Sequence, residues 1–394
     1  MRVLHLIPSI SPLRGGPSQA VLALAAAQRA RGLDAVVLTT NDHGDQVLAD
    51  LPIGRWCDRQ EVPVLAFARW SPPIRALREF AVAPGLLGGL RRELAAADLL
   101  HVHALFSFAS TAGMALARQQ QVPYLVRSIG QLNRWSLRQS PRRKRLLLKL
   151  MERRNLNGAR ALHFTSDAER EEAADLGLRP PPIVLPLGVA LPQLDPTVPV
   201  PADQAVRWLF LSRIHPKKQL PVLFEALADL QRRQPAARWL LDVAGEGDAS
   251  YVEQLQQLAQ RLGLAERIRW CGFAAGEVKA ALLARADWFV LPSASENFGI
   301  AAAEALAAGT PVILSPGVAL APDVRQAGAG LVCEPDPAAL AQALERALQP
   351  PSAAMVEAAR ALAAERYSWP AIAAALEQHY QAILSGGQLL QESC

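Results

Sequence analysis

Short apolar runs alternate with helical patterns along the whole chain. The run Trp288–Leu291 is continuously apolar, which is typical of a parallel strand buried on both faces. A loop follows, and then the alanine-rich stretch 301–308, which consists of strong helix formers and ends at Gly309, a helix C-cap residue. Another apolar strand begins after Pro311. The pattern predicts a strand–loop–helix–strand unit of an α/β protein.

The same alternation recurs before and after this unit. With 394 residues, the chain has room for two domains of ordinary size. Eight prolines between Pro180 and Pro201 predict a stiff linker between them. Residues 41–60 show no clear periodicity and are expected to form a loop. Strands are predicted at 3–7, 35–38, 63–67, 98–103, 122–127, 161–165, 183–185, 208–211, 240–244, 268–271, 288–291 and 330–333, and helices at 18–30, 86–97, 167–176, 301–308, 337–348 and 353–365.

The loop and helix after Trp288–Leu291 carry candidate binding groups. Ligands of open α/β sheets bind at the carboxyl ends of the strands, where this loop is expected to lie. The backbone N–H groups of 298–300 at the helix start are suited to hold an anion or sugar oxygens. Glu296 and Glu304 lie in otherwise apolar surroundings, so their carboxylates need donors, and sugar or ribose hydroxyls are suitable. Bonds to neighbouring backbone amides are the alternative.

In the second half of the chain, two further loops directly follow a predicted strand, as the loop after Trp288–Leu291 does. Arg213 and Lys218 follow the strand 208–211 and lie around a helix start, where they can neutralise a diphosphate, although isolated charges are more often surface residues. Gly245-Glu-Gly247 forms a tight turn after the strand 240–244.

The segment Pro-Ser-x-x-Glu-Asn-Phe-Gly, with Glu296 and Glu304 separated by seven residues, resembles the signature of the retaining family 4 glycosyltransferases. These enzymes have the GT-B fold, and the resemblance extends over nearly the whole chain. It implies an α/β protein with two Rossmann-like domains facing across a cleft. Residues 1–190, joined by a crossing C-terminal helix at 367–386, are expected to bind the acceptor, and residues 202–366 are expected to bind the nucleotide sugar.

The resemblance also implies a reaction. A sugar is expected to move from a UDP- or GDP-sugar to a glycan or lipid-linked acceptor, with retention of anomeric configuration, in bacterial polysaccharide biosynthesis. Acceptor attack and leaving-group departure are expected on the same face of the sugar, with positive groups stabilising the leaving diphosphate. No metal and no cofactor other than the donor substrate are expected. The implied catalytic residues are Glu296, Arg213, Lys218 and His103, and the implied donor-binding residues are Gly15, Gly16, Gly245, Gly247, Phe273, Asn297, Phe298, Gly299, Ile300 and Glu304.

Two positions depart from the family pattern. Ile129 stands where many relatives have a histidine near the reacting sugar, and Leu187 stands where many have an asparagine. Two alternatives stay open. One is a phosphorylase or another nucleotide-sugar-processing enzyme with the same fold. The other, which these departures motivate, is a sugar-nucleotide-binding protein without turnover.

The first half carries weaker motifs. Gly15 and Gly16 precede a helix, so they permit close approach of a phosphate, or they form a turn without function. His101 and His103 alternate along a strand and therefore point to the same face. They could be metal ligands, but no carboxylate or cysteine cluster accompanies them, which favours hydrogen-bonded histidines.

Positive charge is concentrated in residues 138–154. Eight of these residues are basic and one is acidic, whereas the remaining chain has 33 basic and 35 acidic residues. Leucines interleave with the charges. A solvated helix face is one interpretation, and contact with an anionic membrane surface or a lipid-phosphate acceptor is another. No nucleic-acid recognition motif accompanies the stretch, so nucleic acid is not an expected partner.

The cysteines and the lengths of the apolar runs indicate in which cellular compartment the protein is expected. The four cysteines lack ligand spacing, which argues against a disulfide framework and a zinc site. The N-terminal apolar run reaches Pro8 too soon for a signal peptide, and no run is long enough to span a bilayer. A cytoplasmic protein is expected, with peripheral attachment to the inner face of the plasma membrane as an option.

Overall fold

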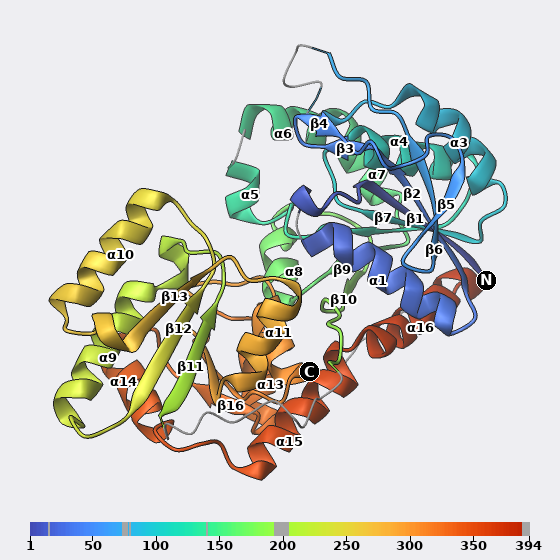
Figure 1. Cartoon of the computed structure of the whole chain (residues 1–394). Coiled ribbons are helices and arrows are strands. Elements are labelled where there is room, and N and C mark those ends of the chain that lie inside the picture. The colour runs from blue at the N-terminus through green and yellow to red at the C-terminus, as the bar shows by residue number, and fades with distance from the viewer. Residues whose placement is uncertain (15, 73–77, 79, 139–140, 193–204, 388–394) are drawn as a thin grey trace. The chain divides into compact units, whose positions relative to one another are not determined.

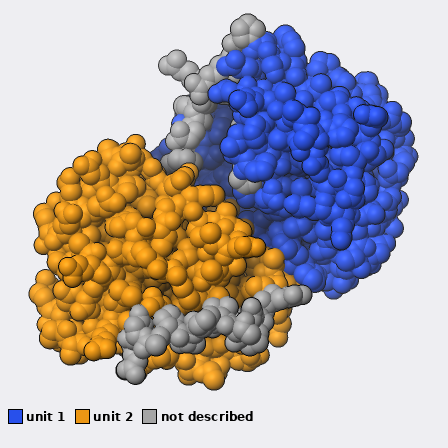
Figure 2. All heavy atoms as spheres, viewed as in Figure 1, with its two compact units in different colours: residues 1–188, 369–394 blue, residues 189–368 orange. Residues whose placement is uncertain are grey.

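The strands form two separate parallel sheets, each in its own unit. The computed structural model describes the chain apart from residues 15, 73–77, 79, 139–140, 193–204 and 388–394. Unit 1 contains Met1–Gly188 and Trp369–Cys394, and unit 2 contains Val189–Ser368, as coloured in Figure 2. The α/β class predicted from the sequence is confirmed in both units. Much of the predicted proline-rich linker lies outside the described residues.

Eight strands make the sheet of unit 1, in the order β10-β9-β8-β7-β1-β2-β6-β5. All neighbours are parallel except β5, which runs antiparallel to β6 at the edge. The prediction of a loop at 41–60 is therefore wrong, because β5 and the short pair β3 and β4 lie in this range. The strands are β1 (Arg2–Ser9), β2 (Asp34–Thr40), β3 (Asp42–His43), β4 (Gln46–Val47), β5 (Trp56–Arg59), β6 (Val62–Phe67), β7 (Leu99–His103), β8 (Tyr124–Arg127), β9 (Ala161–Phe164) and β10 (Pro182–Val184).

Helices cover both faces of this sheet. Leu4 and Leu6 belong to a core that includes residues of α3 and α4, whereas Val3 packs with Leu24 of α1 and Ile372 of α16. The last helix of the chain thus lies beside the first, as Figure 1 shows. The helices are α1 (Gly16–Ala30), α3 (Pro84–Leu94), α4 (Phe108–Gln119), α5 (Arg134–Arg138), α6 (Pro141–Leu147), α7 (Arg153–Asn157), α8 (Asp167–Ala174) and α16 (Trp369–Ser385), with a π-helical turn at Leu148–Glu152 and a 3-10 turn at Pro12–Arg14.

Unit 2 has a six-stranded sheet in the order β13-β12-β11-β14-β15-β16, with every neighbouring pair parallel. Its central strands are buried and almost wholly apolar, as expected when helices cover both faces. The strands are β11 (Val206–Leu211), β12 (Trp239–Ala244), β13 (Ile268–Gly272), β14 (Trp288–Leu291), β15 (Val312–Leu314) and β16 (Gly330–Val332).

The helices of unit 2 follow its strands in regular alternation. They are α9 (Leu220–Arg233), α10 (Ala249–Arg261), α11 (Gly276–Arg285), α12 (Ile300–Ala307), α13 (Ala321–Ala327), α14 (Pro337–Arg346) and α15 (Ala353–Leu362), with 3-10 turns at Pro216–Lys218 and Ala265–Arg267 and a π-helical turn at Ala363–Tyr367. Within the described part of the chain, no helix is both long and apolar enough to cross a membrane.

Strand order reverses once in each sheet. In unit 1 the chain proceeds from β1 to β2 and β6, and then crosses to the opposite side of β1 to form β7. In unit 2 it proceeds from β11 to β12 and β13, and then crosses to form β14 beside β11. Ligands of open α/β sheets bind at the carboxyl ends of strands at such switch points. Each unit therefore has one preferred ligand position.

Candidate active site

The switch point of unit 2 brings together residues far apart in sequence. Arg213 and Lys218 follow β11, and Glu296 follows β14, the neighbouring strand. The Lys218 ammonium contacts the Glu296 carboxylate across this point. The backbone N–H of Ala294 also donates to the carbonyl of Lys217 at 2.9 Å, which ties the two loops together.

The pair of Lys218 and Glu296 is largely shielded from solvent, with side chains 12% and 17% exposed. The hydroxyl of Ser293 donates to the same carboxylate oxygen of Glu296 at 3.1 Å. Burial and the positive charges of Arg213 and Lys217 lower the pKa of Lys218 to about 8. The adjacent carboxylate opposes that shift, because it favours the charged ammonium. Lys218 and Glu296 thus form a partly desolvated ion pair at the switch point.

Helix α12 begins beside this pair without a capping side chain. Its N-cap residue, Gly299, has a φ of 91° and makes no side-chain capping hydrogen bond. An added Cβ at Gly299 would also meet Val318 at 2.9 Å. The ring of Phe298 is buried edge-on to that of Tyr367, at 5.6 Å between centroids. The first N–H groups of α12, near Ile300, thus lack a side-chain cap and are suited to accept an anion.

Glu304, one turn into α12, is also paired with a lysine. Lys279 of α11 donates to the Glu304 carboxylate at 2.6 Å, with side chains 33% and 23% exposed. The alternative of carboxylates bonded to neighbouring backbone amides is therefore not what the structure shows for either glutamate. Lys279 was not predicted from the sequence, because its contact with Glu304 depends on how α11 and α12 pack. Phe273 is 69% exposed after β13, and Asn297 is half-buried.

Gly245 and Gly247 allow the loops after β11 and β12 to meet. A Cβ at Gly245 would lie 1.8 Å from the carbonyl oxygen of Ser212, and one at Gly247 would lie 2.2 Å from that of Ile214. Gly245 also has a φ of 142°, which disfavours other residues. These glycines hold the loop of Arg213 in place.

Gly15 of the first predicted glycine motif lies outside the described residues. Gly16 is the first residue of α1, and a Cβ there would meet no atom within 4 Å. Gly16 is therefore not required by close packing within the protein.

Histidines form a buried row on the face of the unit 1 sheet that α1 and α16 cover. In the parallel register, His5 of β1 pairs with His101 of β7, and Arg127 of β8 pairs with both His103 of β7 and His163 of β9. The rings of His101 and His103 stack at 4.2 Å, which confirms that they share a face. His5 and His163 were missed from the sequence, because only the strand order brings them into this row.

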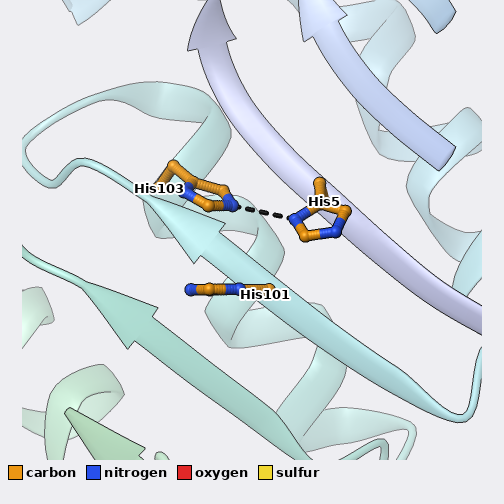
Figure 3. Close-up of side chains that lie close together, drawn as sticks. All are labelled: His5, His101 and His103. Atoms are coloured by element: carbon orange, nitrogen blue, oxygen red, sulfur yellow. Dashed lines mark hydrogen bonds between the residues drawn. The ribbon is translucent and has the colours of Figure 1, made fainter. Parts of the chain in front are cut away.

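Hydrogen bonds link the row to both covering helices. Figure 3 shows the bond of 2.9 Å between Nδ1 of His5 and Nε2 of His103. His5 also bonds to Gln28 of α1 at 2.7 Å, and His101 bonds to the hydroxyl of Tyr380 of α16 at 2.7 Å. His103 is 1% exposed and is the last residue of β7.

His5, His101 and His103 could offer ligand nitrogens that lie within 4.8 Å of one another. Burial is the main cause that lowers the pKa of His5 to about 4; the bond to Gln28 opposes this shift, and the charge of Arg127 adds to it. Arg127 is itself 2% exposed. Among the described residues no carboxylate joins the three rings, so a divalent cation there would lie near the buried positive charge of Arg127 with no carboxylate ligand of its own. The arrangement favours a hydrogen-bonded network over a metal site.

A cavity of about 320 Å³ lies at the switch point of unit 1. Its walls come from the end of β1, from residues 104–107 after β7 and from Ile129 and Gln131 after β8. Ile129, which stands where many relatives have histidine, gives this wall an apolar side chain. Among the described residues, the charged ones that line it are Lys144 of α6 and Asp42. The sequence did not predict that α6 reaches this cavity.

The overall fold is that of the GT-B glycosyltransferases. The crystal structure of Anabaena HepE in complex with UDP and glucose matches 97% of this chain and all of that chain, with a TM-score of 0.69 and 20% identity. The fold expected from the sequence resemblance is thereby confirmed.

Sequence comparisons agree with this fold. The family described as "Glycosyl transferases group 1" matches residues 199–364, and the "Glycosyl transferase 4-like domain" matches residues 15–188. Together they cover most of the chain. The chain belongs to the family 4 glycosyltransferases, which are retaining enzymes.

Two curated relatives illustrate the range of acceptors. A D-inositol 3-phosphate glycosyltransferase of Streptomyces scabiei is 39% identical over 45% of this chain and 41% of its own length. This chain thus spans less than half of the length of that relative. A GDP-mannose:cellobiosyl-diphosphopolyprenol alpha-mannosyltransferase of Komagataeibacter xylinus is 27% identical over all of this chain and 95% of its own length.

Proposed function

We propose that this chain transfers a sugar from a UDP- or GDP-sugar to a glycan or lipid-linked acceptor in polysaccharide synthesis. The observation that carries the proposal is the contact of Lys218 with Glu296 at the switch point of unit 2, beside the uncapped start of α12. This arrangement combines a cation, the N–H groups of a helix start and a carboxylate. A diphosphate needs the first two, and sugar hydroxyls need the third.

Donor binding would replace the contact between the two side chains. The diphosphate would take the ammonium of Lys218 and the guanidinium of Arg213, and hydroxyls of the transferred sugar would take the Glu296 carboxylate. Charge that develops on the leaving diphosphate would be stabilised by these cations and by the start of α12. The reaction would proceed with attack and departure on the same face of the sugar, since no carboxylate among the described residues of unit 2 is positioned as an evident nucleophile. Glu304 would accept hydrogen bonds from ribose.

Unit 1 would supply the acceptor site through its cavity at the switch point. The names of the two curated relatives support an acceptor of this general kind, since one names inositol phosphate and the other a diphosphopolyprenol-linked sugar. The second relative and HepE also name the two candidate nucleotides, GDP and UDP.

A lipid-linked acceptor would bring the protein to a membrane surface. Leu146 and Leu150 are 58% and 66% exposed, and they are one helical turn apart. The exposed side chains of Arg145, Lys149 and Arg153 follow the same spacing beside them. The opposite side of this segment, which includes Glu152 and Leu156, is buried. An exposed face that combines leucines with basic residues suits an anionic lipid surface better than free solvent.

A thermal-shift screen of nucleotides and nucleotide sugars tests the donor half of the proposal. A ligand present at 100 times its dissociation constant adds about 2.7 kcal/mol to stability. UDP or GDP and the matching sugar nucleotides should raise the melting temperature. The lysine-to-glutamine variant Lys218→Gln should reduce the shift without lowering the melting temperature of the free protein by a comparable amount. A wild-type protein that no nucleotide stabilises would refute the proposal.

A further inference from the structure

A short turn between β11 and α9 carries Lys218. The 3-10 turn Pro216–Lys218 begins after His215, whose backbone is extended, and it ends at Gln219, which has a φ of 60°. A positive φ is uncommon for a residue other than glycine, and such a conformation persists only where the surrounding structure enforces it. The turn therefore has a specific shape that neighbouring parts of unit 2 maintain.

Both ends of the turn are anchored in the core of unit 2. Ile214, just before the turn, is buried, and its N–H donates to the carbonyl of Glu246 at 2.8 Å. Leu220, the first residue of α9, is fully buried. The residues between these anchors, 215–219, are exposed or half-buried. Because few buried contacts hold these residues, their position depends on hydrogen bonds within and around the turn.

The ring of His215 makes one of these hydrogen bonds. Its Nδ1 accepts from the backbone N–H of Lys217 at 3.2 Å, as a capping side chain does at the start of a helix. On the other side, the carbonyl of Lys217 accepts from the N–H of Ala294 at 2.9 Å. The main chain of Lys217 is thus held between His215 and the loop after β14, which also carries Glu296. Lys218 is the next residue.

Further hydrogen bonds hold the turn on the other side of Lys218. The side-chain amide of Gln219 donates to the carbonyl of Pro216 at 3.3 Å, and the backbone N–H of Gln219 donates to the same carbonyl at 3.1 Å. The N–H of Lys218 itself donates to the carbonyl of His215 at 2.8 Å. The backbone of Lys218 is therefore fixed from both directions.

The position of this backbone determines where the Lys218 ammonium lies. The side chain is only 12% exposed, and its ammonium contacts the Glu296 carboxylate. A packed side chain has few alternative rotamers, so a displaced turn would also displace the ammonium. The apparent affinity for a ligand falls in proportion to the fraction of molecules that have the binding-competent conformation. A residue that stabilises the turn therefore contributes to binding without contact with the ligand.

We propose that His215 is a positioning residue of the donor site, which caps the turn Pro216–Lys218 and so holds the Lys218 ammonium where the diphosphate binds. The proposal rests on the proposed function, because it concerns the cation that is assigned there to the diphosphate. His215 acts through Lys218 and not through the nucleotide. Direct contact of a charged imidazole with the diphosphate is the alternative that the experiment has to separate.

Calorimetric titration of the full chain with UDP and with GDP tests the role of the cap. The loss of one capping bond changes a local equilibrium about fivefold, so His215→Ala should weaken nucleotide binding about fivefold. His215→Asn should restore the affinity, because asparagine is a strong capping residue and lacks the charge of an imidazolium. Ser352→Ala is the matched control, since Ser352 caps α15 through an equally long bond of 3.2 Å to the N–H of Met355. It should lower the melting temperature and leave the affinity unchanged.

A double-mutant cycle with Lys218→Ala shows through which residue His215 acts. In the Lys218→Ala background, His215→Ala should change the affinity by less than about twofold, because the residue that it positions is gone. A further loss equal to that in wild type would overturn the proposal, and so would an affinity of His215→Asn as low as that of His215→Ala. Unchanged affinity in Lys218→Ala would refute the proposed donor site and this proposal with it. Unchanged affinity in His215→Ala, with Lys218→Ala impaired, would overturn the positioning role alone.

Discussion

The Lys218 ammonium contacts the Glu296 carboxylate although 78 residues separate them in the chain. The contact lies where the strand order of unit 2 reverses, and it is mostly buried. In a donor complex, each group would exchange this partner for one on the substrate. The ion pair holds both side chains in place. It adds little to the stability of the fold, because the cost of desolvating the two buried charges offsets much of their attraction.

Lys218 and Arg213 are expected to carry nucleoside diphosphate binding. A hydrogen bond to a charged group contributes about 1.5–3 kcal/mol, so Lys218→Ala and Arg213→Ala should each weaken UDP or GDP binding tenfold or more. Lys217→Ala is the matched control, because the hydrogen bond of Lys217 to the loop after β14 comes from its backbone carbonyl, which the substitution keeps. Calorimetric titration checks all three variants. Unchanged affinity in both Lys218→Ala and Arg213→Ala would remove them from the site.

Local sequence patterns were sufficient to predict many strands and helices of unit 2. The strand Trp288–Leu291 depends on an apolar run, and the start of α12 depends on Gly299. Both features are formed by residues adjacent in sequence, so the sequence alone reveals them. The partner of each glutamate could not be predicted in this way. Lys218 and Lys279 reach Glu296 and Glu304 only through the packing of separate loops and helices.

In unit 1, more of the structure depends on contacts between distant parts of the chain, which local sequence patterns do not predict. The edge strand Trp56–Arg59 has only four residues, pairs on one side and alternates between exposed and half-buried positions, so it lacks an apolar run. His5 lies in the apolar run 3–7 and His163 in the apolar strand Ala161–Phe164, and a local pattern assigns them no partner. The cross-strand register that joins them through His101, His103 and Arg127 exists only once the strand order is known.

The histidine row predicts acid sensitivity of the fold. Burial lowers the pKa of His5 to about 4, and burial also lowers those of His101, His103 and His163. Between pH 6.5 and 4 the unfolded chain therefore binds more protons than the folded chain, and stability falls as the pH falls. At 1.36 kcal/mol per pKa unit, His5 alone would cost about 3 kcal/mol by pH 4. Urea unfolding at pH 7.5, 6 and 5 measures the slope.

A variant separates this titration from simple loss of contacts. His5→Leu removes the bonds to Gln28 and His103, so it should be less stable than wild type at pH 7.5. It also removes one titrating group, so its stability should decline less steeply on acidification. A slope equal to that of wild type would show that the row does not control acid sensitivity.

The exposed basic and apolar face of residues 145–153 is expected to bind anionic membranes. Arg145→Glu, Lys149→Glu and Arg153→Glu together should abolish sedimentation with vesicles of anionic phospholipid, because they reverse three exposed charges beside Leu146 and Leu150. Added salt should weaken sedimentation of wild type, since the attraction is screened. Reversal of exposed Arg232, Arg261 and Arg346 in unit 2 is the control for net charge alone. If wild type does not sediment at low salt, the face is an ordinary solvated helix surface.

The two glutamates of the donor site should differ in their kinetic effects. Glu304 on α12 is assigned to the ribose hydroxyls, which do not change during transfer, so Glu304→Gln should mainly raise the KM for the donor. Glu296 is assigned to hydroxyls of the transferred sugar, next to developing positive charge, so Glu296→Gln should mainly lower kcat. Glutamine keeps the size and one hydrogen-bond acceptor of glutamate. It removes the carboxylate partner of Lys218 in Glu296→Gln and that of Lys279 in Glu304→Gln. Lys279→Gln therefore serves as a control, because it frees Glu304 without removing its charge, and it should change KM less than Glu304→Gln does. Steady-state kinetics of wild type and the three variants, with a donor that saturates each of them, tests the roles assigned to the two glutamates. The assignment fails if Glu296→Gln leaves kcat intact, or if Glu304→Gln abolishes turnover at unchanged donor affinity.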